Sequence, residues 1–284
     1  MPQRILHSAR ELFALTETSE CVVVDCRFSL DDTGSGRRQY LQAHIPGAVY
    51  AHLDDDLSSP VTPQSGRHPL PSVEKFAAFL GRCGWQPGMK MVVYDDAGGA
   101  IAARLWWLMK YFGQDVASML DGGISAWQMA GYELESGEVN PSATQPVTLT
   151  ANSEMVITAE EIAKRLEGNG IVLVDARAHE RFTGQIEPLD SVAGHIPGSV
   201  NYPYSLNLDQ EGTFLTPDQI RAGMLPLANE HGASGLVHMC GSGVTACHNI
   251  FAAEMVGLSE SRLYAGSWSE WIRDNDRAVA TGVR

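Results

Sequence analysis

The residues with the clearest chemical potential lie around Cys240. The apolar run GLVHMC ends at Cys240, Gly-Ser-Gly follows at 241–243, and an apolar helix is expected to begin near Val244. Glycines let successive backbone N–H groups turn towards one point, and a helix N-terminus adds about half a positive charge, so such a loop stabilises an anion. Helix N-termini lower the pKa of cysteine thiols to between about 3.5 and 7.5. The sequence therefore predicts a nucleophilic thiolate at Cys240.

The same residues allow or exclude other interpretations of this loop. Cys240 also fits the role of a small buried residue at a strand end, which is how most free cysteines behave. A phosphatase loop needs an arginine six positions after the cysteine, where this chain has Ala246. A Gly-x-Ser-x-Gly nucleophile elbow around Ser242 lacks both glycines. Cys247 and His248 have no further ligands nearby, so we interpret them as core residues and predict no metal site.

An internal repeat organises the chain around this loop. Four residues recur 150 positions later: Ser8, Glu11, Asp25 and Arg27 match Thr158, Glu161, Asp175 and Arg177. The tetrapeptide His-Ile-Pro-Gly occurs at 44–47 and again at 195–198, and later matches, such as Trp127 with Trp271, are 144 positions apart. A spacing this long indicates two copies of one domain. At the later offset the first-copy counterpart of Cys240 is Asp96, so one copy alone carries the thiol.

Each copy has the pattern of an α/β domain. Capping boxes at 8–11 and 158–161 predict helix starts, and the apolar runs at 21–25 and 171–175 are typical of buried parallel strands. Each copy then predicts a helix start at 72 or 216, a strand at 90–95 or 235–240, and a longer helix at 100–113 or 244–257. We predict two tandem domains, each a mostly parallel sheet flanked by helices, at 1–138 and 156–284, with a linker at 139–155 that is rich in Ser, Thr, Asn and Pro.

Composition and charge restrict the class of protein. The 284 residues include 34 acidic and 20 basic side chains, a net charge of −14, which disfavours binding to nucleic acid or to an anionic membrane. No apolar run approaches the roughly 20 residues that span a bilayer, and the first residues are too polar for a signal peptide. Five cysteines without a Cys-x-x-Cys pair indicate neither a disulfide framework nor a zinc site. We therefore expect a cytoplasmic globular protein that binds neither nucleic acid nor membrane.

The repeat and its motifs resemble the two-domain rhodanese-like sulfurtransferases. The resemblance is carried by Asp-x-Arg after the first strand of each copy, both His-Ile-Pro-Gly segments, Cys-Gly-Ser-Gly-Val-Thr-Ala at 240–246, and Gly-Ser-Trp-Ser-Glu-Trp at 266–271. The loop is similar to that of 3-mercaptopyruvate sulfurtransferases, because Gly241 and Ser242 are neutral where thiosulfate-using rhodaneses carry basic residues. The resemblance implies two rhodanese-like domains, of which only the second is catalytic, and no metal or organic cofactor.

The resemblance also implies a reaction. Cys240 attacks the sulfur of a small anionic donor, 3-mercaptopyruvate, and a persulfide forms on the cysteine. The persulfide then passes its outer sulfur to a thiol acceptor, such as thioredoxin or a small thiol, or to cyanide. Two alternatives stay open: thiosulfate as the sulfur donor, and a non-catalytic rhodanese-like binding module.

Finally, the resemblance assigns roles to individual residues. The residues that bind the substrate through backbone N–H groups and hydroxyls are Gly241, Ser242, Gly243, Val244 and Thr245. Arg181 is expected to bind the donor carboxylate, for which a planar guanidinium is well matched. Asp54 and His68 are expected to relay or orient a proton at the active site, and they lie in a first-copy region that is seven residues longer than its second-copy equivalent.

Two further observations concern the arginines expected near the active site. The family usually has a second arginine just after Glu-Pro, but this chain reads Glu187-Pro188-Leu189-Asp190. Half of the expected carboxylate clamp is therefore missing from its usual place. Arg177 is present in both copies, as Arg27 in the first, and cannot explain activity in only one of them. We expect it to hold the fold through an ion pair.

Overall fold

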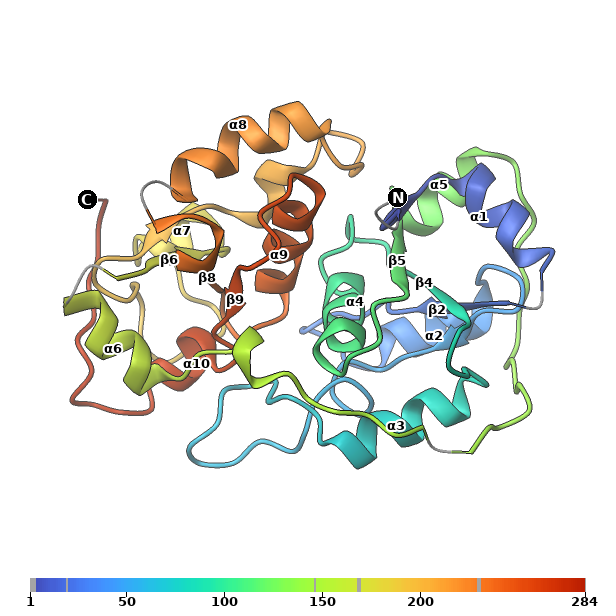
Figure 1. Cartoon of the computed structure of the whole chain (residues 1–284), viewed down its shortest axis with the longest axis horizontal. Helices are drawn as coiled ribbons and strands as arrows, with labels where there is room; N and C mark the ends of the chain where they lie inside the picture. Colours follow the sequence, from blue (N-terminus) through green and yellow to red (C-terminus); the bar gives the residue numbers. More distant parts are fainter. Residues whose placement is uncertain (1–3, 19, 146, 168–169, 229–230, 284) are drawn as a thin grey trace. The chain divides into compact units, whose positions relative to one another are not determined.

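The computed structural model describes residues 4–18, 20–145, 147–167, 170–228 and 231–283. Over these residues the chain divides into two compact α/β units (Figure 1). The first comprises residues 1–59, 70–152 and 210–214, and the second comprises 60–69, 153–209 and 215–284. The predicted fold class is confirmed by the parallel sheets and flanking helices of both units. The domain limits at 138 and 156 stay predictions.

Within the described residues, the first unit is built on a five-stranded parallel sheet. Its strands are β1 (Leu6–His7), β2 (Cys21–Asp25), β3 (Val49–Tyr50), β4 (Lys90–Tyr94) and β5 (Ala117–Leu120), in the order β1-β5-β4-β2-β3. Its helices are α1 (Ala9–Thr16), α2 (Ser35–Gln42), α3 (Val73–Arg82), α4 (Ala102–Tyr111) and α5 (Gly123–Met129). Apart from their first residues, β2 and β4 are buried, as expected for parallel strands covered on both faces.

The second unit repeats this plan with a four-stranded parallel sheet, counted over the residues that the structure describes. Its strands are β6 (Val172–Asp175), β7 (Val200–Asn201), β8 (Leu236–Met239) and β9 (Arg262–Leu263), in the order β7-β6-β8-β9. Its helices are α6 (Ala159–Glu167), α7 (His179–Phe182), α8 (Pro217–Ala228), α9 (Thr245–Met255) and α10 (Ser267–Trp271). Short 3-10 helices are η1 (Ser153–Met155), η2 (Tyr204–Asn207) and η4 (Ala233–Gly235).

Helices begin where the sequence places their caps. The Ser8 N–H donates to the Glu11 carboxylate at 2.9 Å, and the Glu11 N–H donates to the Ser8 hydroxyl at 3.3 Å. Thr158 and Glu161 repeat the capping box at 3.0 and 3.2 Å. Both predicted capping boxes are therefore confirmed. None of the helices in the described ranges combines the length and the apolar character that a bilayer crossing requires.

The aspartate–arginine pairs that recur in both copies are buried ion pairs. Arg27 donates to Asp25 at 2.6 Å and to the Ala43 carbonyl at 2.7 Å. Arg177 likewise donates to Asp175 at 2.7 Å and to the Gly194 carbonyl at 2.8 Å. Both aspartates are fully buried. Each pair therefore fastens the end of a central strand to the segment that precedes the next strand, which confirms the ion pair expected of Arg177.

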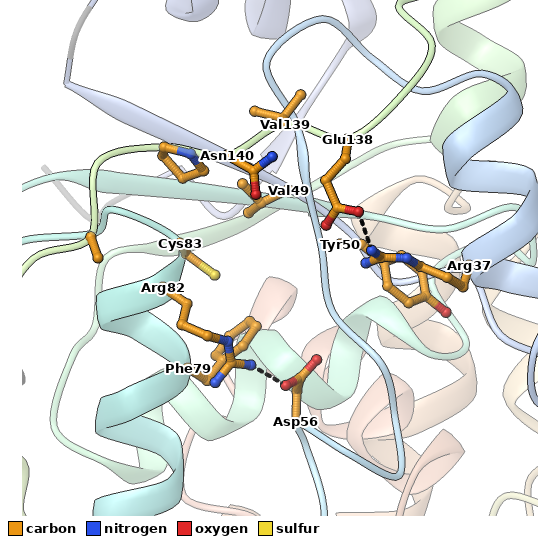
Figure 2. Close-up of a pocket in the computed structure, with 12 residues that line it drawn as sticks. Arg37, Val49, Tyr50, Asp56, Phe79, Arg82, Cys83, Glu138, Val139 and Asn140 are labelled. Carbon is orange, nitrogen blue, oxygen red and sulfur yellow. Dashed lines mark hydrogen bonds and ion pairs between the residues drawn. The ribbon is translucent and has the colours of Figure 1, made fainter.

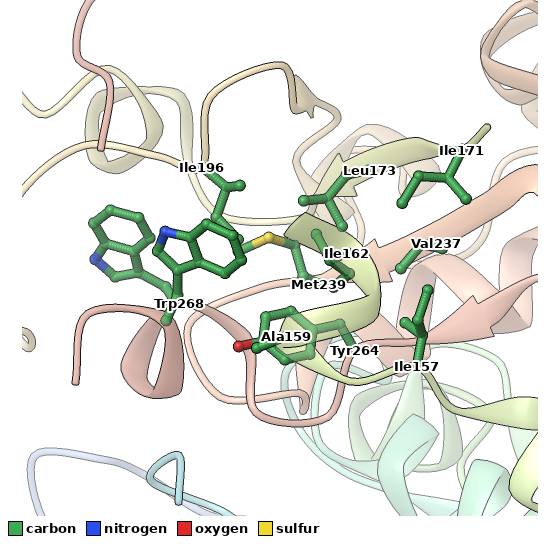
Figure 3. Packing of buried hydrophobic residues seen from close by; sticks show 11 residues of the cluster. Ile157, Ala159, Ile162, Ile171, Leu173, Ile196, Val237, Met239, Tyr264 and Trp268 are labelled. Carbon is green, nitrogen blue, oxygen red and sulfur yellow. The ribbon is translucent and has the colours of Figure 1, made fainter. Parts of the chain in front are cut away.

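An apolar cluster around β6 and β8 fixes where the chain leaves the second sheet. Figure 3 shows Leu173 of β6, Val237 and Met239 of β8, and Trp268 of α10 within this cluster. Met239 is fully buried, so the last residue of β8 is anchored in the core. The chain turns immediately after it, and the first residue of that turn is Cys240.

Candidate active site

The loop between β8 and α9 holds Cys240 inside a tight turn. Cys240 is only 2% exposed, and the Gly243 N–H donates to its sulfur at 3.2 Å. Gly243 has φ +76, and a Cβ at this position would lie 2.4 Å from the Ala265 carbonyl oxygen. Only glycine fits this conformation and this close approach. The second glycine of Gly-Ser-Gly is therefore what lets a backbone N–H reach the sulfur.

The segment that follows β9 fastens this loop from the other side. The Cys240 N–H donates to the Ser267 hydroxyl at 3.1 Å, and the Trp268 N–H donates to the Cys240 carbonyl at 3.0 Å. The Ser269 N–H donates to the Gly241 carbonyl at 2.9 Å. Ser267 has φ +54, which is unusual for a residue with a side chain and fits a position held by its surroundings. The Gly-Ser-Trp-Ser-Glu-Trp motif therefore positions the cysteine loop.

The first-copy counterpart of Cys240 is Asp95, so the prediction of Asp96 is wrong. Asp25 of β2 pairs with Tyr94, whereas Asp175 of β6 pairs with Met239. The residue directly after Tyr94 is therefore equivalent to the residue directly after Met239. The 144-residue offset misplaced the match because the first loop has one more residue between its strand and Gly99 than the second has before Gly243.

The Asp95 carboxylate fills the first loop as an internal anion. It is fully buried and accepts four backbone hydrogen bonds, from Ala97 and Gly99 on one oxygen and from Ile101 and Ala102 on the other, at 2.8–2.9 Å. The Gly99 bond is the counterpart of the bond from Gly243 to the Cys240 sulfur. In the first copy, this loop geometry therefore stabilises a buried negative charge through hydrogen bonds from backbone N–H groups.

The predicted site residues His68 and Ser242 lie together in the second unit. A hydrogen bond of 2.7 Å joins Nδ1 of His68 to the hydroxyl of Ser242, and both side chains are buried. The segment 60–69, which carries His68, packs as part of the second unit. Its backbone passes so close to Gly266 that a Cβ on Gly66 would lie 2.4 Å from the Gly266 carbonyl oxygen. The longer first-copy segment thus supplies a histidine to the cysteine loop.

The predicted Arg181 also lies beside the loop, and the structure adds Arg67, which sequence reasoning did not assign. A Cβ on Gly241 would lie 3.2 Å from Nη2 of Arg67 and 3.5 Å from Nη1 of Arg181. Arg181 donates to both oxygens of Glu187 at 2.8–3.2 Å and to Asp190 at 3.1 Å. Arg67 donates to the other oxygen of Asp190 at 2.7 Å. Two guanidinium groups therefore flank the residue next to Cys240.

A third guanidinium nearby, that of Arg177, has a structural role, because it pairs with Asp175 and Glu187. Burial works to lower the pKa of Arg177, but the carboxylates of Asp175 and Glu187 outweigh it and hold this pKa above its ordinary value. Its ring-stacked position, 4.8 Å from the Trp268 ring centre, ties it to the core. Arg177 therefore anchors Glu187, which in turn orients Arg181.

The remaining predicted residues fall in two places. Val244 and Thr245 form the junction between the loop and α9, so the helix starts within one residue of its predicted position. Asp54 lies in the first unit after β3, where its backbone N–H donates to Nδ1 of His52 at 3.2 Å. Its catalytic role stays a prediction. The part of the chain that the structure describes contains no cluster of three or more potential metal ligands.

A cavity of about 330 Å³ in the first unit contains none of the predicted site residues. Figure 2 shows its polar lining, with Arg37 paired to Glu138 and Arg82 paired to Asp56. Burial raises the pKa of its one lining thiol, Cys83, and Asp56 acts in the same direction. The raised pKa disfavours the thiolate form of Cys83, so the chemistry expected of this chain stays with Cys240.

Fold and site together define a class: a tandem α/β protein in which one copy holds a cysteine in the turn between a strand and a helix, with a backbone N–H donating to its sulfur. Residues 8–130 and 158–274 both match the Rhodanese-like domain. The chain belongs to the family of two-domain rhodanese-like sulfurtransferases, and the resemblance seen in its motifs is confirmed.

Individual relatives carry two kinds of name. A Pseudomonas aeruginosa protein named "Probable 3-mercaptopyruvate sulfurtransferase" is 44% identical over 281 residues, which cover 98% of this chain and 98% of the relative. A Mycobacterium tuberculosis protein with the provisional name thiosulfate sulfurtransferase SseB is 38% identical and covers 99% of this chain and 98% of the relative. The solved structure of 3-mercaptopyruvate sulfurtransferase from Leishmania major has a TM-score of 0.83 and 33% identity, over 95% of this chain and 75% of that one.

Proposed function

We propose that this chain is a sulfurtransferase that takes a sulfane sulfur from 3-mercaptopyruvate onto Cys240 and passes it to an acceptor. The observation that carries the proposal is the pair of equivalent loops. Asp95 in the first loop is a buried anion held by four N–H groups, and Cys240 has the equivalent position in the second. A thiolate or a persulfide at Cys240 is an anion that the same backbone arrangement stabilises. The names of the relatives supply the class of chemistry.

The first step forms a sulfur–sulfur bond. The Cys240 thiolate attacks the donor sulfur, the S–C bond breaks, and its electron pair leaves on the carbon as the enolate of pyruvate. The enolate takes up one proton and becomes pyruvate, so the carbon is reduced while the two bonded sulfurs are oxidised. The N–H groups equivalent to those around Asp95 belong to Gly243, Thr245 and Ala246. They stabilise both the attacking thiolate and the persulfide.

The Ser242 hydroxyl and His68 supply the proton that the enolate takes up. Ser242 lies two residues from Cys240, and its hydroxyl shares a 2.7 Å hydrogen bond with His68. A hydroxyl both donates and accepts, so Ser242 can hand a proton to the enolate and recover one from His68. Asp54 is the remaining member of the proposed catalytic set. Arg181 binds the donor carboxylate, and the loop residues 241–245 bind the enolate oxygen and the outer sulfur of the persulfide.

The second step returns the enzyme to its thiolate form. A thiol, such as that of thioredoxin or a small thiol, or cyanide attacks the outer sulfur, the S–S bond breaks, and its electron pair stays on the Cys240 sulfur. The reaction needs no metal or organic cofactor. We also propose a cytoplasmic location, because all five cysteines are free, which suits a reducing compartment.

Mass spectrometry after incubation with each donor tests the proposal. We expect 3-mercaptopyruvate to add one sulfur atom, about 32 Da, to Cys240, and Cys240→Ser to abolish the adduct. Cys247→Ser is the matched control, because Cys247 is a second buried cysteine seven residues away and should leave the adduct unchanged. If neither 3-mercaptopyruvate nor thiosulfate formed an adduct, the result would favour a non-catalytic rhodanese-like binding module instead.

Thiosulfate is the second candidate donor, because the Mycobacterium tuberculosis relative carries that name. Neutral Gly241 and Ser242 favour 3-mercaptopyruvate over this dianion, in line with the resemblance. Steady-state kcat/KM with both donors separates the candidates. We expect the higher value for 3-mercaptopyruvate, and about a tenfold preference for thiosulfate would overturn the choice.

A further inference from the structure

The polar cavity of the first unit has the size of a small-molecule site. Its volume is about 330 Å³, within the range of ligand pockets. Its lining comes from α2, from β3 and the loop after it, from the last turn of α3, and from residues 138–143. The Val139 N–H donates to the Tyr40 hydroxyl at 3.1 Å, and the Thr144 N–H donates to the Gly81 carbonyl at 3.0 Å. These two bonds hold the segment 138–143 in place as one wall of the cavity.

Two ion pairs face this cavity from different sides (Figure 2). Arg37 of α2 is paired with Glu138, and Arg82 of α3 is paired with Asp56. These four are the charged residues among those that line the cavity, so the lining has no net charge. An anion or a cation alone therefore gains little attraction from the lining as a whole. A small ligand that carries both charges matches it better, because each of its charges finds an opposite partner.

The pair of Arg37 and Glu138 is held in position and has unused hydrogen-bonding groups. The guanidinium carbon of Arg37 lies 5.7 Å from the Tyr40 ring centre and 5.6 Å from the Tyr50 ring centre, so two rings fix it. Over the residues that the structure describes, one hydrogen bond joins the pair, from Nη2 of Arg37 to Oε2 of Glu138. A guanidinium has further N–H donors, and Oε1 of Glu138 accepts no bond from the described chain. Both groups can therefore bind a ligand without breaking the pair.

The cavity also has an apolar surface. Val49, Phe79 and Cys83 line it, and all three side chains are buried in the unit. Burial raises the pKa of the Cys83 thiol, so this group adds no charge to the surface. An aliphatic side chain that packs here leaves water and gains hydrophobic free energy. The lining therefore combines a charged pair with a place for an apolar group.

We propose that this cavity binds an α-amino acid with an apolar side chain. The ligand carboxylate accepts hydrogen bonds from Arg37, the ligand ammonium group donates to Glu138, and the ligand side chain packs on Val49 and Phe79. An α-amino acid carries its two opposite charges on one carbon atom, so a guanidinium and a carboxylate held side by side match it. None of the residues that line the cavity belongs to the proposed catalytic or substrate-binding set, so the inference is independent of the proposed sulfur transfer.

Isothermal titration calorimetry of the full chain with L-leucine provides the first test. We expect saturable binding with a Kd of about 1 mM or lower. Two analogues serve as ligand controls: 3-methylbutylamine lacks the carboxylate, and 4-methylpentanoate lacks the ammonium group. Each should bind at least about tenfold more weakly, because one charge-assisted interaction is lost. The proposal would be overturned if L-leucine showed no saturable binding up to about 10 mM, or if either analogue bound as tightly as L-leucine.

Two substitutions then assign the binding to this cavity. Arg37→Met removes the partner of the ligand carboxylate and should raise the Kd of L-leucine about tenfold. Glu138→Gln removes the partner of the ammonium group, so the preference for L-leucine over 4-methylpentanoate should fall about tenfold. Arg38→Met is the matched control and should leave the Kd unchanged, because Arg38 follows Arg37 in α2, pairs with Asp32 and does not line the cavity. Equal Kd values in Arg37→Met and Arg38→Met, or a wild-type preference in Glu138→Gln, would show that the assignment is wrong.

Discussion

The anion-holding role of the loop can be tested in the copy that has no thiol. Asp95→Asn keeps the shape of the side chain but replaces one carboxylate oxygen by an NH2 group. The wild-type carboxylate accepts two backbone hydrogen bonds on each oxygen, all at 2.8–2.9 Å. The remaining oxygen of asparagine can keep two of them. The other two N–H groups would face a donor, inside a site that is fully buried.

The magnitude follows from the two lost bonds. A hydrogen bond to a charged group contributes about 1.5–3 kcal/mol, so Asp95→Asn should lower the free energy of unfolding of the first unit by about 3–6 kcal/mol. That is a large fraction of the roughly 5–15 kcal/mol that stabilises a domain. Urea unfolding measures it, with tryptophan fluorescence as the probe, since Trp85, Trp106, Trp107 and Trp127 lie in the first unit.

Asp96→Asn is the matched control, because Asp96 is the adjacent acid and is exposed. It should change the free energy of unfolding by no more than about 0.5 kcal/mol. If Asp95→Asn also stayed within about 1 kcal/mol of wild type, the converging N–H groups would not favour an anion. The argument that the equivalent groups stabilise a thiolate and persulfide at Cys240 would then lose its basis.

Two further substitutions test the second unit. Asp175→Asn removes the nearer of the two carboxylates that pair with the buried Arg177 guanidinium, so the free energy of unfolding should fall by about 3–5 kcal/mol in urea curves; a loss under about 1 kcal/mol would contradict the structural role of the pair. Burial lowers the pKa of His238 from 6.5 to about 3, and within the described residues neither ring nitrogen has a hydrogen-bond partner. Because the unfolded chain binds a proton below about pH 6.5 and the folded chain does not until about pH 3, this contribution to stability is complete above pH 6.5 and is lost as the pH falls from 6.5 towards 3. Between about pH 7.5 and about pH 5.5, wild type should therefore lose about 1.4 kcal/mol more than His238→Leu, and equal losses in the two proteins would refute the assignment.

Much of the fold was predictable because its signals are local. The capping boxes at Ser8 and Thr158, and the apolar runs that became β2 and β6, each depend on residues a few positions apart. The repeat then supplied the long-range information, since two copies of one pattern imply one fold used twice. The loop around Cys240 was predictable for the same reason, because a strand end, two glycines and a helix start are adjacent in the sequence.

The equivalence of Asp95 and Cys240 could not be found by counting residues. Offsets count residues along the chain, but the first loop holds one residue more than the second between its strand and the turn glycine that both copies share, Gly99 or Gly243. The strand pairing identifies the equivalent residues. The register of β4 against β2 ends at Tyr94, and the register of β8 against β6 ends at Met239. Hydrogen-bond partners across a sheet are not encoded by local spacing.

Arg67 was missed for a different reason. Next to His68, in a segment without a helix or strand pattern, an arginine is ordinarily a solvated side chain, and no motif says where its guanidinium points. Its place beside Gly241 depends on two contacts that are far apart in the sequence, with Ser269 and with Asp190.

The two copies differ by more than the exchange of an aspartate for a cysteine. Each unit includes a segment from the other half of the sequence: residues 60–69 belong to the second unit, and residues 210–214 belong to the first. The segment in the second unit contains Arg67 and His68, whereas the segment in the first unit, Gln-Glu-Gly-Thr-Phe, contains neither arginine nor histidine. The first loop therefore has its own carboxylate in place of a thiol and receives no cationic or proton-carrying side chain from this exchange. A cysteine at position 95 alone would not reproduce the second site, because the segment exchanged into the first unit supplies no counterpart of Arg67 or His68.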